Sequence, residues 1–520
     1  MIVTTIRLTD GVAHQIEVVF PFDYPDVEPT VCGPPLLTRH QNARDGNFCL
    51  MANPAVDWHP LRSAAELVDK NLRNLLEDSA AGPAVVAGGE ADMPEPLSMH
   101  ISPTSRDVVL VPDPFWRLEL DRTGGDLVLR ETYGSALVVV KQDNNSGNGK
   151  AIDSVEHSRA SDIAAAWVSL SDGALKPWPT RKEVLDAALA ADTDILRHIR
   201  KRLKRNKALH AEGWIGITFQ EEGPQVGMIR RGWTFIEVQL QRDRPKRPRL
   251  IALRRAAAFT ESERALRLPE LRGIANATVV VVGAGSVGAP LVLELAKAGA
   301  GHITVVDPDA YDVNNATRHI LAPYRAGRLK AAAVAVDAEA LNPFVTVECS
   351  RLAIGAGGAE EAMKLDQIIA RARVLVDATG SPIAARILAR RCREHAVTMI
   401  VSGLTAGSYG ADIATLPPEG PCYWCLQLGQ ADGSIPAPPV GPTSSTTPTG
   451  CATPAFSGAG FDATALAALT ARRVVQAADI TEYPPAAAPL TVLDFRGEPA
   501  EQHVDLPVHP SCPLCQPPSG

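Results

Sequence analysis

Three glycines at GxGxxG spacing are the residues of this chain that point most directly to chemistry. Gly283, Gly285 and Gly288 follow the β-branched, apolar run Thr278–Val282. The first glycine can make a tight turn after a strand, the second lets a phosphate approach the backbone, and the third lets the next helix pack closely. Asp307 ends a second apolar run, at roughly the 20-residue distance typical of a ribose ligand. The pattern predicts a nucleotide site between strand and helix, with a purely structural glycine turn as the alternative.

Four polar residues after Asp307 narrow the choice of nucleotide. They are Asp309, Asn315, Arg318 and Lys330. Together with Asp307 they resemble the motifs of the ThiF/MoeB adenylation family, the core of ubiquitin-activating enzymes. The resemblance implies ATP as cofactor, with Asp307 on the ribose and the two cations on the phosphates. Fixed cations suit the charge that develops when a carboxylate attacks the α-phosphate of ATP. Either cation taken alone is typical of a solvated helix face.

Two further residues are assigned to ATP through the same resemblance. Many family members read DxTDN after the next strand, and their second aspartate handles magnesium. This chain has Gly380 at that position, so either Asp377 faces the Mg²⁺ or ATP itself holds most of the ion; Asp377 is the working hypothesis. Related enzymes carry a phosphate-binding arginine before the first strand, and Arg267 is the candidate here, with Arg264 and Arg272 as competitors.

Four cysteines in two CxxC pairs predict a metal site. They are Cys422, Cys425, Cys512 and Cys515. Four thiolates satisfy the tetrahedral preference of Zn²⁺ and leave no open position, so the predicted zinc is structural. Both pairs stand among prolines and glycines, and we expect them in turns. A redox-active CxxC is the alternative, which two matched pairs make the weaker interpretation.

The N-terminal region carries a second candidate for covalent chemistry. Its proline-punctuated sequence resembles a ubiquitin-conjugating fold, with His40 and Asn42 at the family's HPN motif, Cys49 at its reactive cysteine and Trp58 following. The resemblance implies that Cys49 carries an acyl group and that Asn42 donates to the oxyanion formed when an amine attacks, a role for which an uncharged amide is suited. Gln41 replaces the family's proline, a departure that could weaken activity. A buried structural thiol is the alternative role of Cys49.

A third cysteine, Cys451, ends a stretch rich in proline, serine and threonine, which we interpret as a crossover loop. Related activating enzymes carry their thioester cysteine here, just before a helix, and a helix N-terminus stabilises a thiolate. A zinc ligand or a chance surface thiol is the alternative, but four better-placed zinc ligands exist.

Taken together, the motifs resemble the fused conjugating–activating enzymes of bacteria, notably those of CBASS-type anti-phage operons. The implied reaction begins with adenylation of the C-terminus of a ubiquitin-like protein or another partner, such as a cyclic-nucleotide synthase. The acyl group then passes to Cys451, to Cys49 and finally to an acceptor lysine. The family is commonly dimeric, so a homodimer is expected. Two rivals remain open: activation of a sulfur carrier, which does not need Cys49, and a nucleotide-binding scaffold whose N-terminal module only docks a partner.

Length and charge limit the remaining possibilities. The chain has 520 residues, a formal net charge of −8 and an isoelectric point near 5.9, which argue against a nucleic-acid-binding protein. We interpret the basic run Arg197–Lys207 as a solvated helix end. The sequence contains no long uncharged apolar stretch and no recognisable signal peptide, so no membrane span and a cytoplasmic location are expected.

The predicted fold is α/β, with a Rossmann-like ThiF adenylation domain, an N-terminal α+β ubiquitin-conjugating-like domain and a middle α+β linker domain. Within the middle domain, Leu185, Leu189, Leu196, Ile199 and Leu203 recur at helical spacing and predict one continuous helix over Arg181–Leu203. The expected boundaries are residues 1–85 for the conjugating-like domain, 86–105 for a linker, 106–260 for the middle domain and 261–520 for the adenylation domain with its crossover loop and zinc site.

Overall fold

The computed structural model divides the chain into two compact units, Met1–Glu263 and Arg264–Gly520. It describes all residues except 8–10, 38–39, 43–44, 52, 81–107, 113–122, 133–135, 143–161, 172–173, 176–178, 207, 223–228, 245, 443–455, 479–481 and 517–520. Among the described residues, no helix is both long enough and apolar enough to cross a membrane. The proposed linker over 86–105 falls outside them.

The first unit begins with a small antiparallel sheet in the order β1-β2-β3, backed by helical turns. The sheet's inner face is apolar because alternate strand residues point to one side, and Ile16 and Val18 meet Leu67 and Leu72 there. The elements are β1 (Ile2–Arg7), β2 (Ala13–Val19), β3 (Thr30–Cys32), α1 (Pro54–Asp57), α2 (Ala64–Glu66), the π-helical η1 (Leu67–Leu72) and α3 (Arg73–Ala80). This sheet-and-helix arrangement is α+β, while its kinship with conjugating enzymes stays a prediction.

The rest of the first unit is a closed barrel with strand order β10-β4-β6-β5-β7-β8-β9, in which β9 pairs back to β10. Its interior holds Trp167, Trp233 and Phe235, whose rings contact one another in sequence. The strands are β4 (Val109–Pro112), β5 (Gly124–Thr132), β6 (Ala136–Gln142), β7 (Ile163–Ser169), β8 (His210–Glu222), β9 (Ile229–Gln241) and β10 (Arg249–Phe259). Large aromatic residues facing inward fill the barrel, so it is a packed core.

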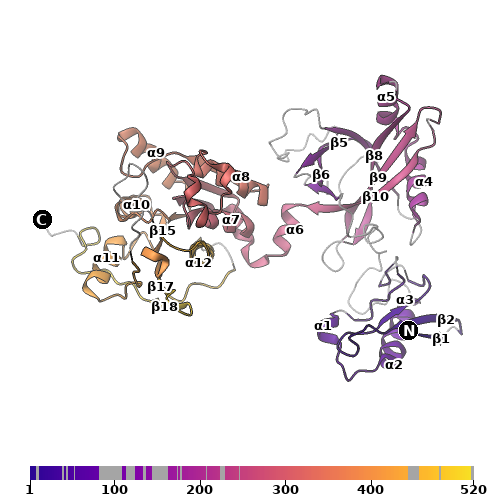
Figure 1. Cartoon of the computed structure of the whole chain (residues 1–520), viewed down its shortest axis with the longest axis horizontal. Coiled ribbons are helices and arrows are strands. Elements are labelled where there is room, and N and C mark those ends of the chain that lie inside the picture. The colour runs from indigo at the N-terminus through magenta and orange to yellow at the C-terminus, as the bar shows by residue number, and fades with distance from the viewer. Residues whose placement is uncertain are drawn as a thin grey trace. The chain divides into compact units, whose positions relative to one another are not determined.

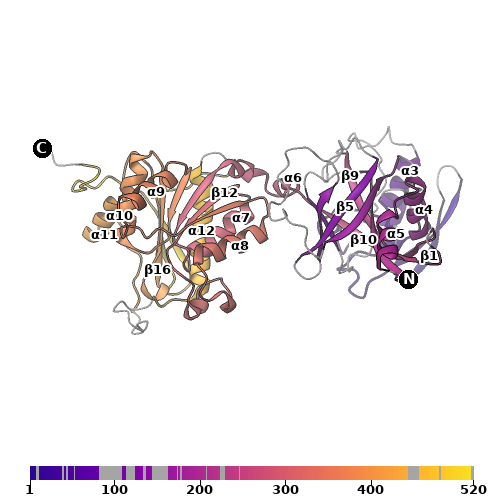
Figure 2. The same cartoon turned by 90° about the horizontal axis from the view of Figure 1, so that it is seen from above.

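Two helices cover part of the outer face of this barrel, where the sequence predicted a single one (Figures 1 and 2). They are α4 (Arg181–Ala191) and α5 (Arg197–Asn206). The prediction was wrong because Asp192 adopts an extended backbone at the end of α4 and its carboxylate accepts the N–H of Asp194. Aspartate favours such local turns over helix. The apolar residues keep their helical spacing on both sides of this turn, because both helices bury their apolar residues against the barrel.

The second unit is built on one eight-stranded sheet in the order β13-β12-β11-β14-β15-β16-β17-β18. Pairing is parallel from β13 to β15 and antiparallel from there to β18. The strands are β11 (Thr278–Val282), β12 (His302–Val306), β13 (Thr346–Ser350), β14 (Val374–Asp377), β15 (Thr398–Leu404), β16 (Gly410–Leu416), β17 (Leu490–Asp494) and β18 (Ala500–Val504). The parallel strands β11 and β14 are wholly or almost wholly buried, as expected for strands covered on both faces.

Helices lie on both faces of that sheet, with α7 and α8 on one side and α9 and α10 on the other (Figure 2). The α-helices are α6 (Glu261–Leu266), α7 (Gly288–Ala298), α8 (Lys330–Leu341), α9 (Ala359–Ile369), α10 (Pro382–Glu394), α11 (Tyr423–Asp432) and α12 (Gly460–Ala478). Short 3₁₀ turns are η4 (Pro269–Asn276), η5 (Val313–Thr317), η6 (Pro323–Arg325) and η7 (Ala406–Ser408). The predicted unit of strand, glycine loop, helix and strand is confirmed as β11, α7 and β12.

The strand order gives the second unit a topological switch point between β11 and β14. β12 and β13 lie to one side of β11, and β14 and β15 lie to the other. The connections therefore leave in opposite directions at β11 and β14, and open α/β sheets bind ligands at the carboxyl ends of strands at such a switch point.

Candidate functional site

The glycine loop after β11 meets the loop after β14 at this switch point. Gly283 has φ +93°, and a Cβ there would lie 2.8 Å from the carbonyl oxygen of Ala378. A Cβ at Gly288 would lie 1.8 Å from the carbonyl oxygen of Gly283. Both positions therefore require glycine because of the protein's own packing. At Gly285 a Cβ would meet nothing within 4 Å, which leaves space beside its backbone; the approach of a phosphate there stays a prediction.

Asp307 holds the glycine loop to the segment that follows β12. Its side chain is 6% exposed. One carboxylate oxygen accepts the backbone N–H of Ala284 at 2.6 Å, and the other accepts that of Asp309 at 2.8 Å. Each carboxylate oxygen can accept a second hydrogen bond, so a ribose contact is compatible with this arrangement. The structure adds a second role, because Asp307 fixes the two segments relative to each other.

Asp309 and Lys330 form the next connection outward. The Lys330 ammonium lies 2.9 Å from a carboxylate oxygen of Asp309, and its backbone N–H donates to the Asp309 carbonyl at 2.9 Å. The lysine side chain is 13% exposed, whereas that of the aspartate is 63% exposed. The lysine is therefore held at the start of α8 by a partner that solvent or an incoming anion can compete with.

Arg318 is oriented by Asn315, as the spacing of the two residues allows. The Arg318 guanidinium donates to the side-chain oxygen of Asn315 at 2.7 Å and lies 5.9 Å from the ring centre of Phe456. Partial burial lowers the pKa of this guanidinium, because desolvation disfavours its charge. Within the described part of the chain, no carboxylate forms an ion pair with it, so this half-buried cation would gain from an anionic ligand.

His319 belongs to the same group of residues and was missed by sequence reasoning. Its Nε2 lies 2.8 Å from the carbonyl oxygen of Ala284 in the glycine loop, and its Nδ1 accepts the N–H of Leu321 at 3.1 Å. This pattern requires the proton on Nε2, and burial lowers the pKa of the imidazole. The neutral ring therefore holds the carbonyl of Ala284, the residue whose N–H Asp307 accepts. Only its position next to Arg318 could have signalled this role.

Asp377 and Asp412 both line a cavity of about 280 Å³ beyond β14. Burial raises the pKa of Asp377 to about 6, although one oxygen accepts two hydrogen bonds from Thr379. Burial also raises the pKa of Asp412, whose carboxylate accepts from Gln430 at 3.1 Å. Carboxylate oxygens are the protein ligands that Mg²⁺ prefers, so this donor set fits the ion. The sequence did not single out Asp412, which is carried by the antiparallel strand β16.

Arg267 is exposed in the turn after α6 and Arg264 is half-buried nearby. The backbone N–H of Arg267 donates to the Arg264 carbonyl at 3.1 Å, and the Arg264 side chain reaches the Leu341 carbonyl. Among the described residues, no hydrogen bond joins either side chain to the glycine loop. The phosphate role of Arg267 stays a prediction.

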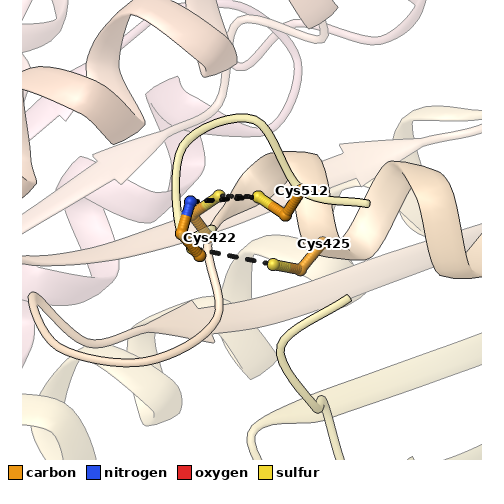
Figure 3. A group of neighbouring side chains, drawn as sticks. Cys422, Cys425 and Cys512 are labelled. Carbon is orange, nitrogen blue, oxygen red and sulfur yellow. Dashed lines mark hydrogen bonds between the residues drawn. The ribbon is translucent and has the colours of Figure 1, made fainter. Parts of the chain in front are cut away.

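The two CxxC pairs come together as expected, 90 residues apart in the chain (Figure 3). The four sulfurs lie within 4.8 Å of one another. The distance is 3.5 Å from Cys422 to Cys512 and 3.7 Å from Cys425 to Cys515. Four thiolates at about 2.3 Å from a zinc ion would lie about 3.8 Å apart in a tetrahedron, whereas disulfide sulfurs lie about 2.05 Å apart. The geometry fits zinc.

The surroundings of this cysteine cluster differ from the expected pair of turns. Cys422 caps α11 and Cys425 lies within its first turn, so one pair is helical. From α10, Arg386 stacks on Trp424 with 4.3 Å to the ring centre, and Arg393 donates to the carbonyl of Gly420 at 2.8 Å. These contacts attach the cluster to the sheet's helical layer.

In the first unit, the chain from His40 to Cys49 folds back on itself. Gln41 bridges to Phe48, the N–H of Cys49 donates to the His40 carbonyl, and that of Asn42 donates to the Asn47 carbonyl, both at 2.7 Å. Opposed residues of an antiparallel pair point to the same side. Gln41 and Phe48 are buried, while Cys49 is exposed. Asn42 and Cys49 therefore share the outward side, whereas His40 has a left-handed backbone (φ +61°) to which this alternation does not apply. The exposure of Cys49 makes the buried-thiol alternative wrong.

Gln41 acts as the internal support of this hairpin. It is 1% exposed. Its side-chain oxygen accepts the N–H groups of Leu36 and Leu37 at 3.0 and 3.1 Å, and its amide nitrogen donates to the carbonyls of Pro34 and Gly46 at 2.8 and 3.1 Å. A buried amide with this many partners fixes the chain on both sides of it. The departure noted in the sequence therefore supplies hydrogen bonds that a proline could not.

Cys451 lies outside the described residues. α12 begins at Gly460, nine residues further on. Support for its thiolate from a helix N-terminus stays a prediction. The chain is described again at Phe456, beside Arg318.

The second unit and the chain as a whole are similar to different sets of known proteins. Residues 259–510 match the model of the ThiF family. The matched residues cover nearly all of the second unit. The SAMP-activating enzyme E1 of Haloferax volcanii is 32% identical over 160 residues, which cover 30% of this chain and 56% of that enzyme.

A longer similarity spans both units. The uncharacterized protein y4oA of Sinorhizobium fredii is 25% identical over 485 residues, covering 84% of this chain and 78% of that protein. Among solved structures, E. coli MccB with succinimide matches with a TM-score of 0.37 and 19% identity, covering 48% of this chain and 70% of that one.

Replacement of two glycines by alanine should separate folding from nucleotide binding. In Gly288→Ala, the new Cβ collides with a backbone carbonyl, so we expect a loss of stability of at least about 2 kcal/mol, against a helix-propensity gain of about 1 kcal/mol. In Gly285→Ala, thermal unfolding should be unchanged while ATP binding weakens. Unfolding curves and ATP titration measure both. Equal ATP affinity in Gly285→Ala would show that no phosphate approaches there.

Removal of one cysteine ligand should remove the zinc. Wild-type protein should contain about one zinc per chain, and Cys422→Ser should lose it together with stability of the second unit, because metal binding and folding are coupled. Cys349→Ser, at an exposed thiol of β13, is the matched control and should retain the metal. Metal analysis with thermal unfolding decides, and a metal-free wild type that is stably folded would contradict the assignment.

Proposed function

We propose that the ThiF-family domain uses ATP to adenylate the C-terminal carboxylate of a partner protein, and that the acyl group then passes through cysteines to an amine. The observation that carries the first step is the group at the switch point: an open glycine backbone at Gly285 with two cations, Arg318 and Lys330, tied to the segment that Asp307 holds against it.

Adenylation is the chemistry that such a site favours. A carboxylate oxygen attacks the α-phosphorus, the bond to the bridging oxygen breaks, and pyrophosphate leaves. Negative charge grows on the phosphoryl oxygens during this step, and cations held in advance stabilise it without reorganisation. Mg²⁺, when bound to Asp377 and Asp412, would neutralise further phosphate charge.

A relay through Cys451 rests on the resemblance to activating enzymes, whose thioester cysteine stands just before a helix. Cys451 precedes Phe456 by five positions in the sequence, and the Phe456 ring lies 5.9 Å from the Arg318 guanidinium. Attack of the Cys451 thiolate on the acyl-adenylate would form a thioester and release AMP.

The final transfer is assigned to Cys49 because its thiol is exposed and shares the outward side of the hairpin with Asn42. An amide is a suitable donor for the oxyanion of an amine attacking a thioester. A ubiquitin-like protein as the partner, a lysine as acceptor, a homodimer and a role in anti-phage defence complete the proposal. Activation of a sulfur carrier is the second candidate, supported by the adenylation site alone.

The adenylation step can be tested by ATP–pyrophosphate exchange in the presence of the partner. Lys330→Ala should reduce the exchange rate at least about 100-fold, the scale found when one charge-stabilising donor is lost. Lys364→Ala, an exposed lysine of α9 in the same domain, should exchange at the wild-type rate. If both variants exchange normally, Lys330 has no part in the reaction.

The order of the two cysteines can be tested by trapping thioesters on non-reducing gels. Cys49→Ala should still form a reducible adduct with the partner, on Cys451, whereas Cys451→Ala should make the adenylate and load neither cysteine. Cys349→Ala should behave as wild type. A normal rate of Cys49 loading in Cys451→Ala would replace the relay by direct transfer, and normal exchange with no thioester in any variant would favour sulfur-carrier activation.

A further inference from the structure

Helix α5 concentrates positive charge on the surface of the barrel. Its sequence RHIRKRLKRN holds six arginines and lysines and no acid. Ile199 and Leu203 are buried against the barrel, and Arg197, Arg200 and Arg202 are half-buried. Lys201, Lys204 and Arg205 are exposed. A helix of this length presents the charges along about 15 Å.

The connection between β9 and β10 supplies a second basic segment. Residues 242–249 read RDRPKRPR, with five arginines and lysines and one acid, Asp243. Arg244, Lys246, Arg247 and Arg249 are exposed. Within this segment, Arg244 lies 3.9 Å from its own neighbour Asp243, and both side chains are largely exposed.

Both segments adjoin the same short stretch at the start of β8. α5 is attached there by Arg202, which donates to the carbonyl of Glu212 at 2.9 Å, and it packs so closely that a Cβ on Gly213 would lie 2.3 Å from Ile199. The β9–β10 connection begins beside the same stretch, because the N–H of Arg242 donates to the carbonyl of Leu209 at 2.9 Å. The tertiary structure therefore joins two basic segments into one basic surface.

A hollow of about 260 Å³ lies between α5 and the start of β8, lined on one side by Arg202 and Asn206 and on the other by His210 and Glu212. Glu212 is the acid at its rim, and its side chain accepts a hydrogen bond from Gln239 at 3.3 Å. Arg200, on the neighbouring turn of α5, lies 2.7 Å from Asp194. At the start of α5, Arg197 pairs with Asp126 and lies 3.3 Å from Asp192, and His198 lies 2.6 Å from Asp126. Among the described residues, no carboxylate forms an ion pair with Lys201, Lys204 or Arg205, so these three carry the uncompensated charge of α5.

The composition of the surface points to one class of partner. Interfaces between proteins have a core depleted in charge and enriched in aromatic residues, whereas α5 and residues 242–249 contain no Phe, Tyr or Trp. Single-stranded nucleic acid is held by stacking on aromatic rings, which these two segments also do not offer. Arginines outnumber lysines in both segments, and one guanidinium can bind two phosphate oxygens at once. A duplex presents one phosphate charge per about 1.7 Å of its axis.

We propose that this basic surface, formed by α5 and the β9–β10 connection, binds the phosphate backbone of a nucleic-acid duplex without reading its sequence. The proposal departs from the expectation drawn from the net charge of −8. Attraction at a surface depends on the charges within about one Debye length, roughly 8 Å at physiological salt, and not on the sum over the chain. The binding is independent of the proposed adenylation, since the basic surface lies in the first unit and the nucleotide site in the second.

Fluorescence anisotropy with a labelled duplex DNA of arbitrary sequence tests the proposal on the full chain. Wild-type protein should bind, with an affinity that falls as salt rises. Lys201→Glu with Lys204→Glu should weaken binding at least about 10-fold and flatten the slope of log K against log salt by about 0.9 for each phosphate that the variant no longer neutralises. Lys246→Glu with Arg247→Glu should have the same effect, which tests the second segment independently.

The matched control reverses two exposed lysines of the second unit, Lys297→Glu with Lys364→Glu, and should change the affinity less than about 2-fold, because charges outside the basic surface are screened. Unchanged thermal unfolding and unchanged ATP–pyrophosphate exchange in the α5 variant would show that the loss is local. The proposal is overturned if the wild type does not bind duplex at about 50 mM salt, where phosphate binding is strong. It is also overturned if control and α5 variants lose affinity equally, or if polyglutamate or anionic vesicles compete more effectively than unlabelled duplex.

Discussion

The Asp307 carboxylate is the interaction on which the candidate nucleotide site depends. Its two oxygens hold the glycine loop and the segment after β12 together. That segment carries Asp309, which in turn holds Lys330 at the start of α8. Loss of the carboxylate would leave two N–H groups without this acceptor, at about 1–3 kcal/mol each where they are buried, and would release the lysine's support. Asp307, which the family resemblance assigns to the ATP ribose, is thus also a structural support of the site.

Local pattern in the sequence was enough to predict the second unit's nucleotide motif. The apolar runs of β11 and β12 and the glycine spacing are local patterns, each visible within a few residues of sequence. The CxxC pairs lie far apart, but the preference of zinc for four thiolates predicts that they meet. Contacts between distant segments were not predictable in this way. Asp412 reaches the cavity from an antiparallel strand, and Gln41 gains its role only when several segments of backbone surround it.

Averages over the whole chain conceal the charge of its parts. The net charge of −8 sums two units, although α5 contains only basic charges. A helical period likewise survives the turn at Asp192, which is why periodicity alone predicted one helix in place of two. Neither the net charge of a chain nor the spacing of its apolar residues shows where the chain turns back on itself. A local cue was present in each case, namely the absence of acids in the basic run and the aspartates of the turn.

The cysteine cluster also has a consequence for covalent integrity. It joins positions 90 residues apart, and β16 pairs with β17 across the same interval. A chain cut once between α11 and α12 would therefore remain one particle, because the strand ladder and the packing of α12 against the sheet would hold its two fragments together. The two fragments would resemble a split protein whose halves reassemble. If the predicted zinc is bound, a chelator would remove one further connection between them.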